Sequence, residues 1–95
     1  MAVLVLANVP GQTTSGYDQI LNALTGELLK APGFLMNAAH PTDDSWRTIE
    51  VWESKQAADA FFAKYVRPNL PPGLHPKRVY HELHVVVTPD GKIYR

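Results

Sequence analysis

The chain has 95 residues, enough for one domain of ordinary small size and too few for two, so residues 1–95 are expected to share one core. Nine Lys and Arg balance nine Asp and Glu, and no segment concentrates either sign, which argues against binding to nucleic acid or to an anionic membrane. A hydrophobic content of 45% with 19% charged residues predicts a globular fold. The absence of cysteine excludes disulfides, thiolate metal sites and a cysteine nucleophile, and it fits a reducing cytoplasm.

The first expected element is a strand at residues 2–9, AVLVLANV, which is apolar on both faces like a central strand and ends at Pro10-Gly11. Its apolar run at 2–7 is far too short to span a membrane and lacks the basic flank and cleavage site of a signal peptide. We therefore expect no membrane partner.

A helix is expected next, from about Gly16 to Lys30. Ser15 followed by Asp18 resembles a capping box at its start, and the Pro-Gly pair at 32–33 stops it. Its apolar positions repeat at helical spacing and form one stripe, consisting of Tyr17, Ile20, Leu21, Leu24 and Leu28.

Two strands at 33–40 and 46–53, joined by a polar turn at 41–44, should form an antiparallel hairpin. Ser54 can then cap a second helix, which ends before Arg67 because a residue that precedes proline resists helical geometry. A proline-rich loop at 67–78 leads to a last long strand at 79–88, and a turn at 89–91 precedes the tail KIYR. The buried stripe of the second helix is expected to be Ala58, Phe61, Phe62 and Tyr65.

This β-α-β-β-α-β order predicts an α+β, ferredoxin-like sandwich with both helices on one face of an antiparallel sheet. Because side chains alternate along a strand, aliphatic residues are expected on the helix side. The opposite face is then too apolar for water, which predicts a dimer interface, a small-molecule pocket or both. The helix-side set is Val3, Val5, Ile49, Val51, Leu83 and Val85, and the opposite set is Leu4, Leu6, Asn8, Trp46, Thr48, Glu50, Trp52, Tyr80, Glu82, His84 and Val86.

Several features resemble the antibiotic-biosynthesis-monooxygenase-like group of dimeric α+β barrel proteins. They are the Pro-Gly-Phe entry to the second strand at 32–34, the stretch SWRTIEVWES at 45–54, the AADAFF run at 57–62, and the proline-rich loop before a strand with an aliphatic-flanked His84. The resemblance spans nearly the whole chain. Its motifs mark the fold better than the chemistry, because oxygenases, haem degraders, isomerases, cyclases and proteins of no known activity share this fold.

The resemblance implies a homodimer in which each subunit holds a small aromatic or polyketide-like molecule between its sheet and its helices or loops. Some members oxidise phenols to quinones with O₂ and no cofactor. Such chemistry needs a base, a donor for the resulting oxyanion and walls that exclude water. Asn8, Trp52 and His84 are the expected catalytic residues, because the first strand should lie between the third and the fourth.

Each member of this trio also has a purely structural interpretation. His84 can be a hydrogen-bonded residue among the aliphatic residues of its strand. Trp52 can pack in the core or in an interface, and Asn8 can simply end its strand. Glu50 and Glu82 can each orient His84, act as the base, or form a salt link to Arg47, to Arg78 or to a partner subunit.

Further residues are expected to bind the substrate. Asn37 is among them, although a reverse register of the second strand would turn it toward the helices. Tyr65 and His75 are placed where a loop can rim the pocket. The full set is Asn37, Thr48, Glu50, Tyr65, His75, Tyr80 and Glu82.

No cofactor is expected, since the sequence has no Gly-rich phosphate loop and no flavin or nicotinamide fingerprint. His81 and His84 do not form a metal motif, because residues three apart on a strand face opposite sides. The haem-degrading branch carries its axial histidine on the second helix, where this chain has Phe61 and Phe62.

The leading hypothesis is a cofactor-independent monooxygenase for a phenolic or polyketide-like aromatic substrate. The alternative is a non-catalytic small-molecule-binding or structural dimer, with a haem degrader, a cyclase or an isomerase ranked lower. A roomy cavity favours the enzyme, whereas a cavity filled by side chains favours the structural dimer.

Overall fold

Strand β1 (Val3–Asn8) is the centre of the sheet in the computed structural model, which describes residues 1–95. β3 (Trp46–Trp52) pairs with one edge of β1 and β4 (Lys77–Glu82) with the other, while β2 (Phe34–Pro41) pairs with β3. All these pairings are antiparallel, and the order is β2-β3-β1-β4. The predicted α+β, ferredoxin-like topology, with the first strand between the third and the fourth, is therefore confirmed.

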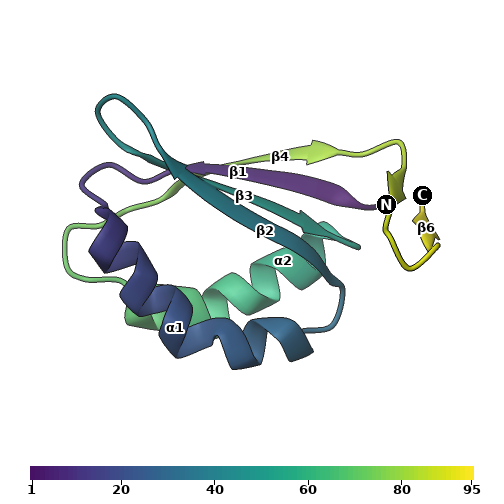
Figure 1. The fold of residues 1–95 in the computed structure, drawn as a ribbon, viewed down its shortest axis with the longest axis horizontal. Helices are drawn as coiled ribbons and strands as arrows, with labels where there is room; N and C mark the ends of the chain where they lie inside the picture. The colour runs from purple at the N-terminus through teal and green to yellow at the C-terminus, as the bar shows by residue number, and fades with distance from the viewer.

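Helices α1 (Thr14–Lys30) and α2 (Lys55–Phe61) cover one face of the sheet and leave the other uncovered (Figure 1). Ser54 caps α2 as predicted, because its Oγ accepts a hydrogen bond from the Ala57 backbone N–H at 3.1 Å. The predicted cap of α1 is wrong. Thr13 has the extended backbone of a cap and its Oγ1 accepts from the Gly16 N–H at 3.0 Å, whereas Ser15 already lies inside the first turn.

The second helix changes its geometry where the sequence predicted a plain α-helix up to Arg67. After Phe61 the chain continues as a π-helical turn, η1 (Phe62–Val66), and a 3₁₀ turn, η2 (Arg67–Asn69). Pro68 in η2 has no backbone N–H to donate, which agrees with the end of regular helix at this point. Turns of the π type are rare and occur frequently at functional sites.

The predicted last strand at 79–88 is wrong in its length. β4 ends at Glu82, and Leu83 makes one more hydrogen bond, from its N–H to the Ala2 carbonyl at 2.8 Å. His84 then forms a bend, which ends the pairing with β1. The chain instead forms a small separate hairpin from β5 (Val86–Val87) and β6 (Ile93–Tyr94), around the predicted turn at 89–91.

The strand registers decide which side chains face the helices. Directly opposed residues of an antiparallel pair share a face, and Val3 is opposite both Trp52 and Glu82. Val3 and Trp52 pack with Phe61 of α2 in one buried cluster, so this is the helix side. The predicted faces of β1 are thus confirmed, whereas those of β3 and β4 are wrong. The helix side holds Trp46, Thr48, Glu50 and Trp52 of β3 with Arg78, Tyr80 and Glu82 of β4.

The face of the sheet turned away from the helices is largely apolar. Val79 is 52% exposed and Met36 is 42% exposed. The apolar residues of this outer face, as the registers place them, are Leu4, Leu6, Met36, Ala38, Ile49, Val51 and Val79. Neither helix combines the length and the apolar content that crossing a membrane requires.

Candidate functional site

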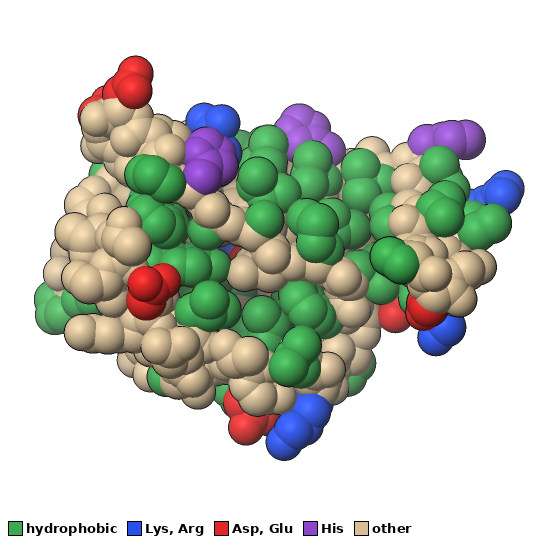
Figure 2. Space-filling model, viewed as in Figure 1, with side chains coloured by type: hydrophobic (Ala, Val, Ile, Leu, Met, Phe, Trp, Pro, Cys, Tyr) green, Lys and Arg blue, Asp and Glu red, His purple; other side chains and the backbone are tan.

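A cavity of about 90 Å³ lies between the sheet and the helices. Its roof is the apolar stripe predicted for the first helix. Phe61, Phe62 and Val66 close one side, where α2 passes into η1. Along the boundary between the sheet and helix layers, hydrophobic side chains gather on both sides (Figure 2). The remaining lining residues are Ala7, Val9, Gln12, Tyr17, Ile20, Leu21, Leu24, Leu28, Asn37, Thr48, Glu50, Leu70, Pro76 and Arg78.

Three strands, β2, β3 and β4, supply the few polar groups of the cavity floor, and the central β1 supplies apolar surface. Asn37 of β2 is opposite Glu50 of β3, and Thr48 of β3 is opposite Ala7 of β1, which is in turn opposite Arg78 of β4. The floor therefore carries polar groups on both sides of β1, and Glu50 and Arg78 approach each other across it.

Glu50 is held by two groups at the floor of the cavity. The Trp52 indole Nε1–H donates a hydrogen bond to Glu50 Oε1 at 2.9 Å, and Arg78 Nη1 lies 3.7 Å from Glu50 Oε2. The side chains of Glu50 and Arg78 are 17% and 11% exposed. Oε1 is thus occupied by a protein donor, while the longer contact leaves Oε2 able to accept from a bound molecule.

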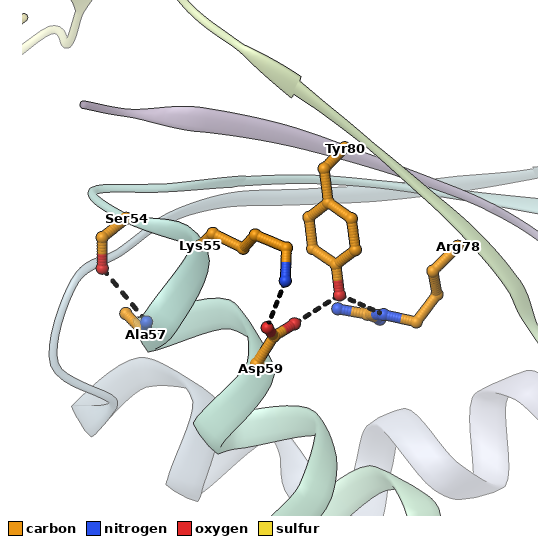
Figure 3. A network of polar contacts seen from close by, with 6 residues as sticks. All are labelled: Ser54, Lys55, Ala57, Asp59, Arg78 and Tyr80. Atoms are coloured by element: carbon orange, nitrogen blue, oxygen red, sulfur yellow. Dashed lines mark hydrogen bonds and ion pairs between the residues drawn. The ribbon is translucent and has the colours of Figure 1, made fainter.

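Arg78 belongs to a chain of polar contacts that reaches the surface (Figure 3). Its Nε donates to the Tyr80 hydroxyl at 3.3 Å, and the Tyr80 hydroxyl donates to Asp59 Oδ1. Lys55 Nζ lies 2.8 Å from Asp59 Oδ2. Phe62 covers the guanidinium of Arg78, whose Cζ is 4.2 Å from the ring centroid.

Tyr17 and Asn37 form a second polar pair in the cavity wall. The Asn37 Nδ2 donates to the Tyr17 hydroxyl at 2.9 Å, so the phenolic proton of Tyr17 is free to be donated elsewhere. Burial raises the pKa of the Tyr17 hydroxyl, and the negative charge of Glu50 raises it further, against the opposing effect of the Asn37 hydrogen bond. Tyr17 therefore remains a neutral donor at ordinary pH.

Solved structures of known proteins share this architecture. A cofactor-independent oxygenase, SnoaB from Streptomyces nogalater, matches with a TM-score of 0.69 and 13% identity over 87% of this chain and 93% of that one. A monooxygenase, ActVA-Orf6 from Streptomyces coelicolor in complex with nanaomycin D, matches with 0.61 and 23% identity over 93% and 92%. The haem degrader MhuD from Mycobacterium tuberculosis, with two haems bound, matches with 0.61 and 17% identity over 93% and 100%.

The chain has the antibiotic-biosynthesis-monooxygenase-like fold. No protein-family model and no curated protein sequence matches it. At these identities the likeness concerns the fold alone, and this fold is host to several activities. The assignment of a reaction has to come from the side chains of this chain.

The structure does not bring the three expected catalytic residues of this chain together. Trp52 is fully buried on the helix side of the sheet. Asn8 is exposed, and its Oδ1 accepts from Arg47 Nε at 3.3 Å on the outer face. His84 is exposed in the bend that follows β4. The expectation that these residues converge is wrong, because β3 has the opposite facing and β4 ends before His84.

The expected substrate-binding residues divide into two groups. Asn37, Thr48 and Glu50 line the cavity, and Asn37 has the helix-side orientation that was kept as an alternative. Tyr80 lies behind Arg78 and packs against the buried cluster around Trp52. The others lie outside the cavity: Tyr65 packs on Phe61 with ring centroids 5.0 Å apart, and His75 and Glu82 are exposed.

Tyr17, Arg78 and Phe62 are cavity residues to which the sequence analysis gave no binding role. Tyr17 belongs to the apolar stripe of the first helix, where a tyrosine is most simply interpreted as a core residue. Arg78 stood at the end of a proline-rich loop and was considered only as a salt-link partner, and a link to Glu50 is indeed present. The pairing of β4 with β1 places Arg78 on the helix side of the sheet, and the sequence alone does not give this pairing.

The lining residues do not fit a haem group. None of them is a histidine, cysteine or methionine, and the one tyrosine, Tyr17, is kept neutral by its raised pKa. A porphyrin is also far larger than a cavity of about 90 Å³. No cluster of three or more His, Cys, Asp or Glu residues is arranged to hold a metal ion.

Proposed function

We propose that this chain is a cofactor-independent monooxygenase that oxidises a small phenolic aromatic molecule in the cavity between the sheet and the helices. The observation that carries the proposal is Glu50, the one carboxylate that lines the cavity, set among apolar walls beside the neutral donor Tyr17. A phenol in this cavity meets an acceptor for its proton, a donor for its oxygen and surroundings that exclude bulk water. The shared fold with SnoaB and ActVA-Orf6 is consistent with this reaction.

The proposed reaction needs no resident cofactor because the substrate itself supplies the electrons. Glu50 Oε2 accepts the phenolic proton, and the resulting electron-rich anion reacts with O₂ to form a carbon–oxygen bond. Loss of water from the peroxide intermediate leaves a quinone, so phenol and O₂ are converted to quinone and one water. Tyr17 donates a hydrogen bond to the phenolate oxygen of the substrate and stabilises the negative charge on that oxygen.

Glu50→Gln tests the role of the carboxylate without removing the fold. The glutamine can still accept from Trp52 Nε1 but cannot take a proton, so oxygen consumption should fall by roughly 10²- to 10⁴-fold. The protein should still unfold cooperatively, at a melting temperature lowered by the loss of the charge opposite Arg78. Glu53→Gln is the matched control, since Glu53 is exposed at the end of the same strand and should retain the full rate. Equal rates in wild type and Glu50→Gln would reject Glu50 as the base.

A second candidate function is a non-catalytic small-molecule-binding protein of the same fold. The cavity volume favours it, because about 90 Å³ is below the ~300–1,000 Å³ of most ligand sites. Binding of phenols with no oxygen consumption by the wild-type protein, over a panel of hydroquinones and anthrone-like phenols, would select this function.

A further inference from the structure

Arg78 presents a buried donor that no protein atom satisfies. Its Nε donates to Tyr80 and its Nη1 lies near Glu50, but its Nη2 is buried and has no hydrogen-bond partner. An unpaired buried donor on a charged group is costly, and most such groups in native proteins have an acceptor. Because Arg78 lines the cavity, the missing acceptor fits a bound molecule.

The guanidinium of Arg78 is fixed from three elements, as Figure 3 shows for its polar partners. Tyr80 on β4 accepts from Nε, and Asp59 on α2 fixes the Tyr80 hydroxyl by accepting from it. Lys55 holds Asp59 from the solvent side, and the Phe62 ring of η1 packs on the guanidinium. A donor held in this way binds an acceptor without first losing side-chain freedom.

The size of the cavity limits the molecule that can accept this hydrogen bond. A dry cavity of about 150 Å³ in another protein binds benzene, so a space of about 90 Å³ needs only a small displacement of its walls to hold one ring. A tricyclic molecule would need a several-fold enlargement. The apolar residues that α1 contributes to the lining suit the faces of an aromatic ring.

We propose that Arg78 Nη2 binds the oxygen of a single-ring aromatic ligand in this cavity, and that Tyr80 and Asp59 are positioning residues for Arg78. The ligand class is a phenol, phenolate or ring ketone. The inference rests on the cavity being the ligand site of the proposed function, but it concerns binding and holds whether or not O₂ reacts.

The binding test uses 4-nitrophenol, whose phenolate is coloured, and 4-nitrotoluene, which lacks the oxygen. We expect Arg78→Met to weaken 4-nitrophenol binding by about 10- to 100-fold, the range for a hydrogen bond to a charged group, and to leave 4-nitrotoluene binding nearly unchanged. The pKa of bound 4-nitrophenol should also be lower in wild type than in Arg78→Met by about 1, because a guanidinium favours the anion. Arg47→Met is the matched control, since Arg47 lies on the outer face beside Asn8.

Tyr80→Phe tests the positioning role while keeping Arg78 itself. It removes the acceptor of Arg78 Nε, so 4-nitrophenol binding should weaken by about 3- to 10-fold, and the pKa of the bound phenol should lie between those of wild type and Arg78→Met. If Arg78→Met does not fold, this variant and Arg78→Lys still decide the question. Asp59→Asn should show the same direction as Tyr80→Phe.

The outcomes separate the inference from the proposed function. Unchanged 4-nitrophenol affinity and bound pKa in Arg78→Met, or no 4-nitrophenol binding to wild type, would overturn Arg78 as the donor. Wild-type behaviour of Tyr80→Phe would overturn the positioning role, and tighter binding of anthrone than of 4-nitrophenol would overturn the single-ring class. If the wild-type protein consumes no oxygen but its 4-nitrophenol binding depends on Arg78, the monooxygenase proposal is rejected and this inference stands.

Discussion

Trp46 and Trp52 are buried indoles at opposite ends of β3, yet only one of them has a partner for its N–H. Trp52 Nε1 donates to Glu50, whereas Trp46 Nε1 is buried without an acceptor. Replacement by phenylalanine removes a similar area of buried apolar surface at both positions, but it breaks a hydrogen bond to a carboxylate only at Trp52. We expect Trp52→Phe to lower the free energy of unfolding by about 1.5–3 kcal/mol more than Trp46→Phe in urea titrations. Equal losses would mean that the Glu50 contact contributes little to stability.

The position of His84 also has a measurable consequence. His84 is exposed after the end of β4 and is not part of the cavity wall, so the structure gives it no contact with a molecule bound there. We expect His84→Gln to change the oxygen-consumption rate by no more than about twofold, as for most surface substitutions. A fall of 10²-fold or more in a folded His84→Gln protein would restore the sequence-based hypothesis that His84 is the base.

Asp59 connects the network behind Arg78 to the pH dependence of stability. Hydrogen bonds from Lys55 and then from Tyr80 hold the pKa of the Asp59 carboxyl below its ordinary value. A group with a lowered pKa in the folded state stabilises fully above its unfolded pKa and loses this contribution as the pH falls through the folded pKa. We therefore expect the unfolding free energy to fall on acidification, and Asp59→Asn to reduce this dependence in urea titrations between neutral and acidic pH. The same pH slope in both proteins would show that Asp59 does not contribute.

At the level of the elements, the start of α1 offers a direct test of its cap. Thr13 satisfies the Gly16 N–H, while Ser15 is exposed within the first helical turn. We expect Thr13→Ala to cost about 1 kcal/mol and Ser15→Ala to stay within about 0.5 kcal/mol of wild type in urea unfolding. A larger loss for Ser15→Ala would indicate that the helix begins later than the structure places it.

Helix and strand identities were predictable because their apolar residues repeat at periods of 3.6 and 2. The facing of β3 was not, since its two sides are both partly apolar. The rule that aliphatics face the helices selected Ile49 and Val51, but the space under the helices is filled by Trp52 and holds the polar Thr48 and Glu50 beside a cavity. Alternation along a strand gives two sets of side chains without saying which set is inside.

Some residues of the candidate site were predictable from the sequence and others were not. Thr48 and Glu50 were predicted to share one face, and they do, because the alternation of β3 keeps them together whichever way the strand is turned. That face is the helix side and not the opposite side that was predicted. Arg78 and Tyr17 were missed, since their contribution depends on the pairing of β4 with β1 and on the position of α1 over β2. Such long-range pairings are properties of the fold and leave no signal in local sequence.

For the whole molecule, the uncovered face of the sheet predicts self-association. Leu6 of β1 is opposite Val79 of β4 on this face, and Val79 is 52% exposed in the single chain. An apolar sheet surface of this kind is typically covered, and a second copy of the same face provides a self-complementary cover with two-fold symmetry. We expect the protein to be a homodimer by sedimentation and light scattering at micromolar concentration.

The variant Val79→Asp tests which face forms that dimer. A carboxylate buried in a sheet interface would lack a partner, so the dimer dissociation constant should rise by roughly 10²-fold or more. Leu29→Asp is the matched control, because Leu29 is 72% exposed on α1 and lies on the helix layer. The cavity lies on the helix side of the sheet and Val79 on the outer face, so a monomeric Val79→Asp protein should still bind 4-nitrophenol. Loss of the dimer in Leu29→Asp but not in Val79→Asp would place the interface on the helices, and loss of ligand binding in the monomer would show that the cavity needs the second subunit.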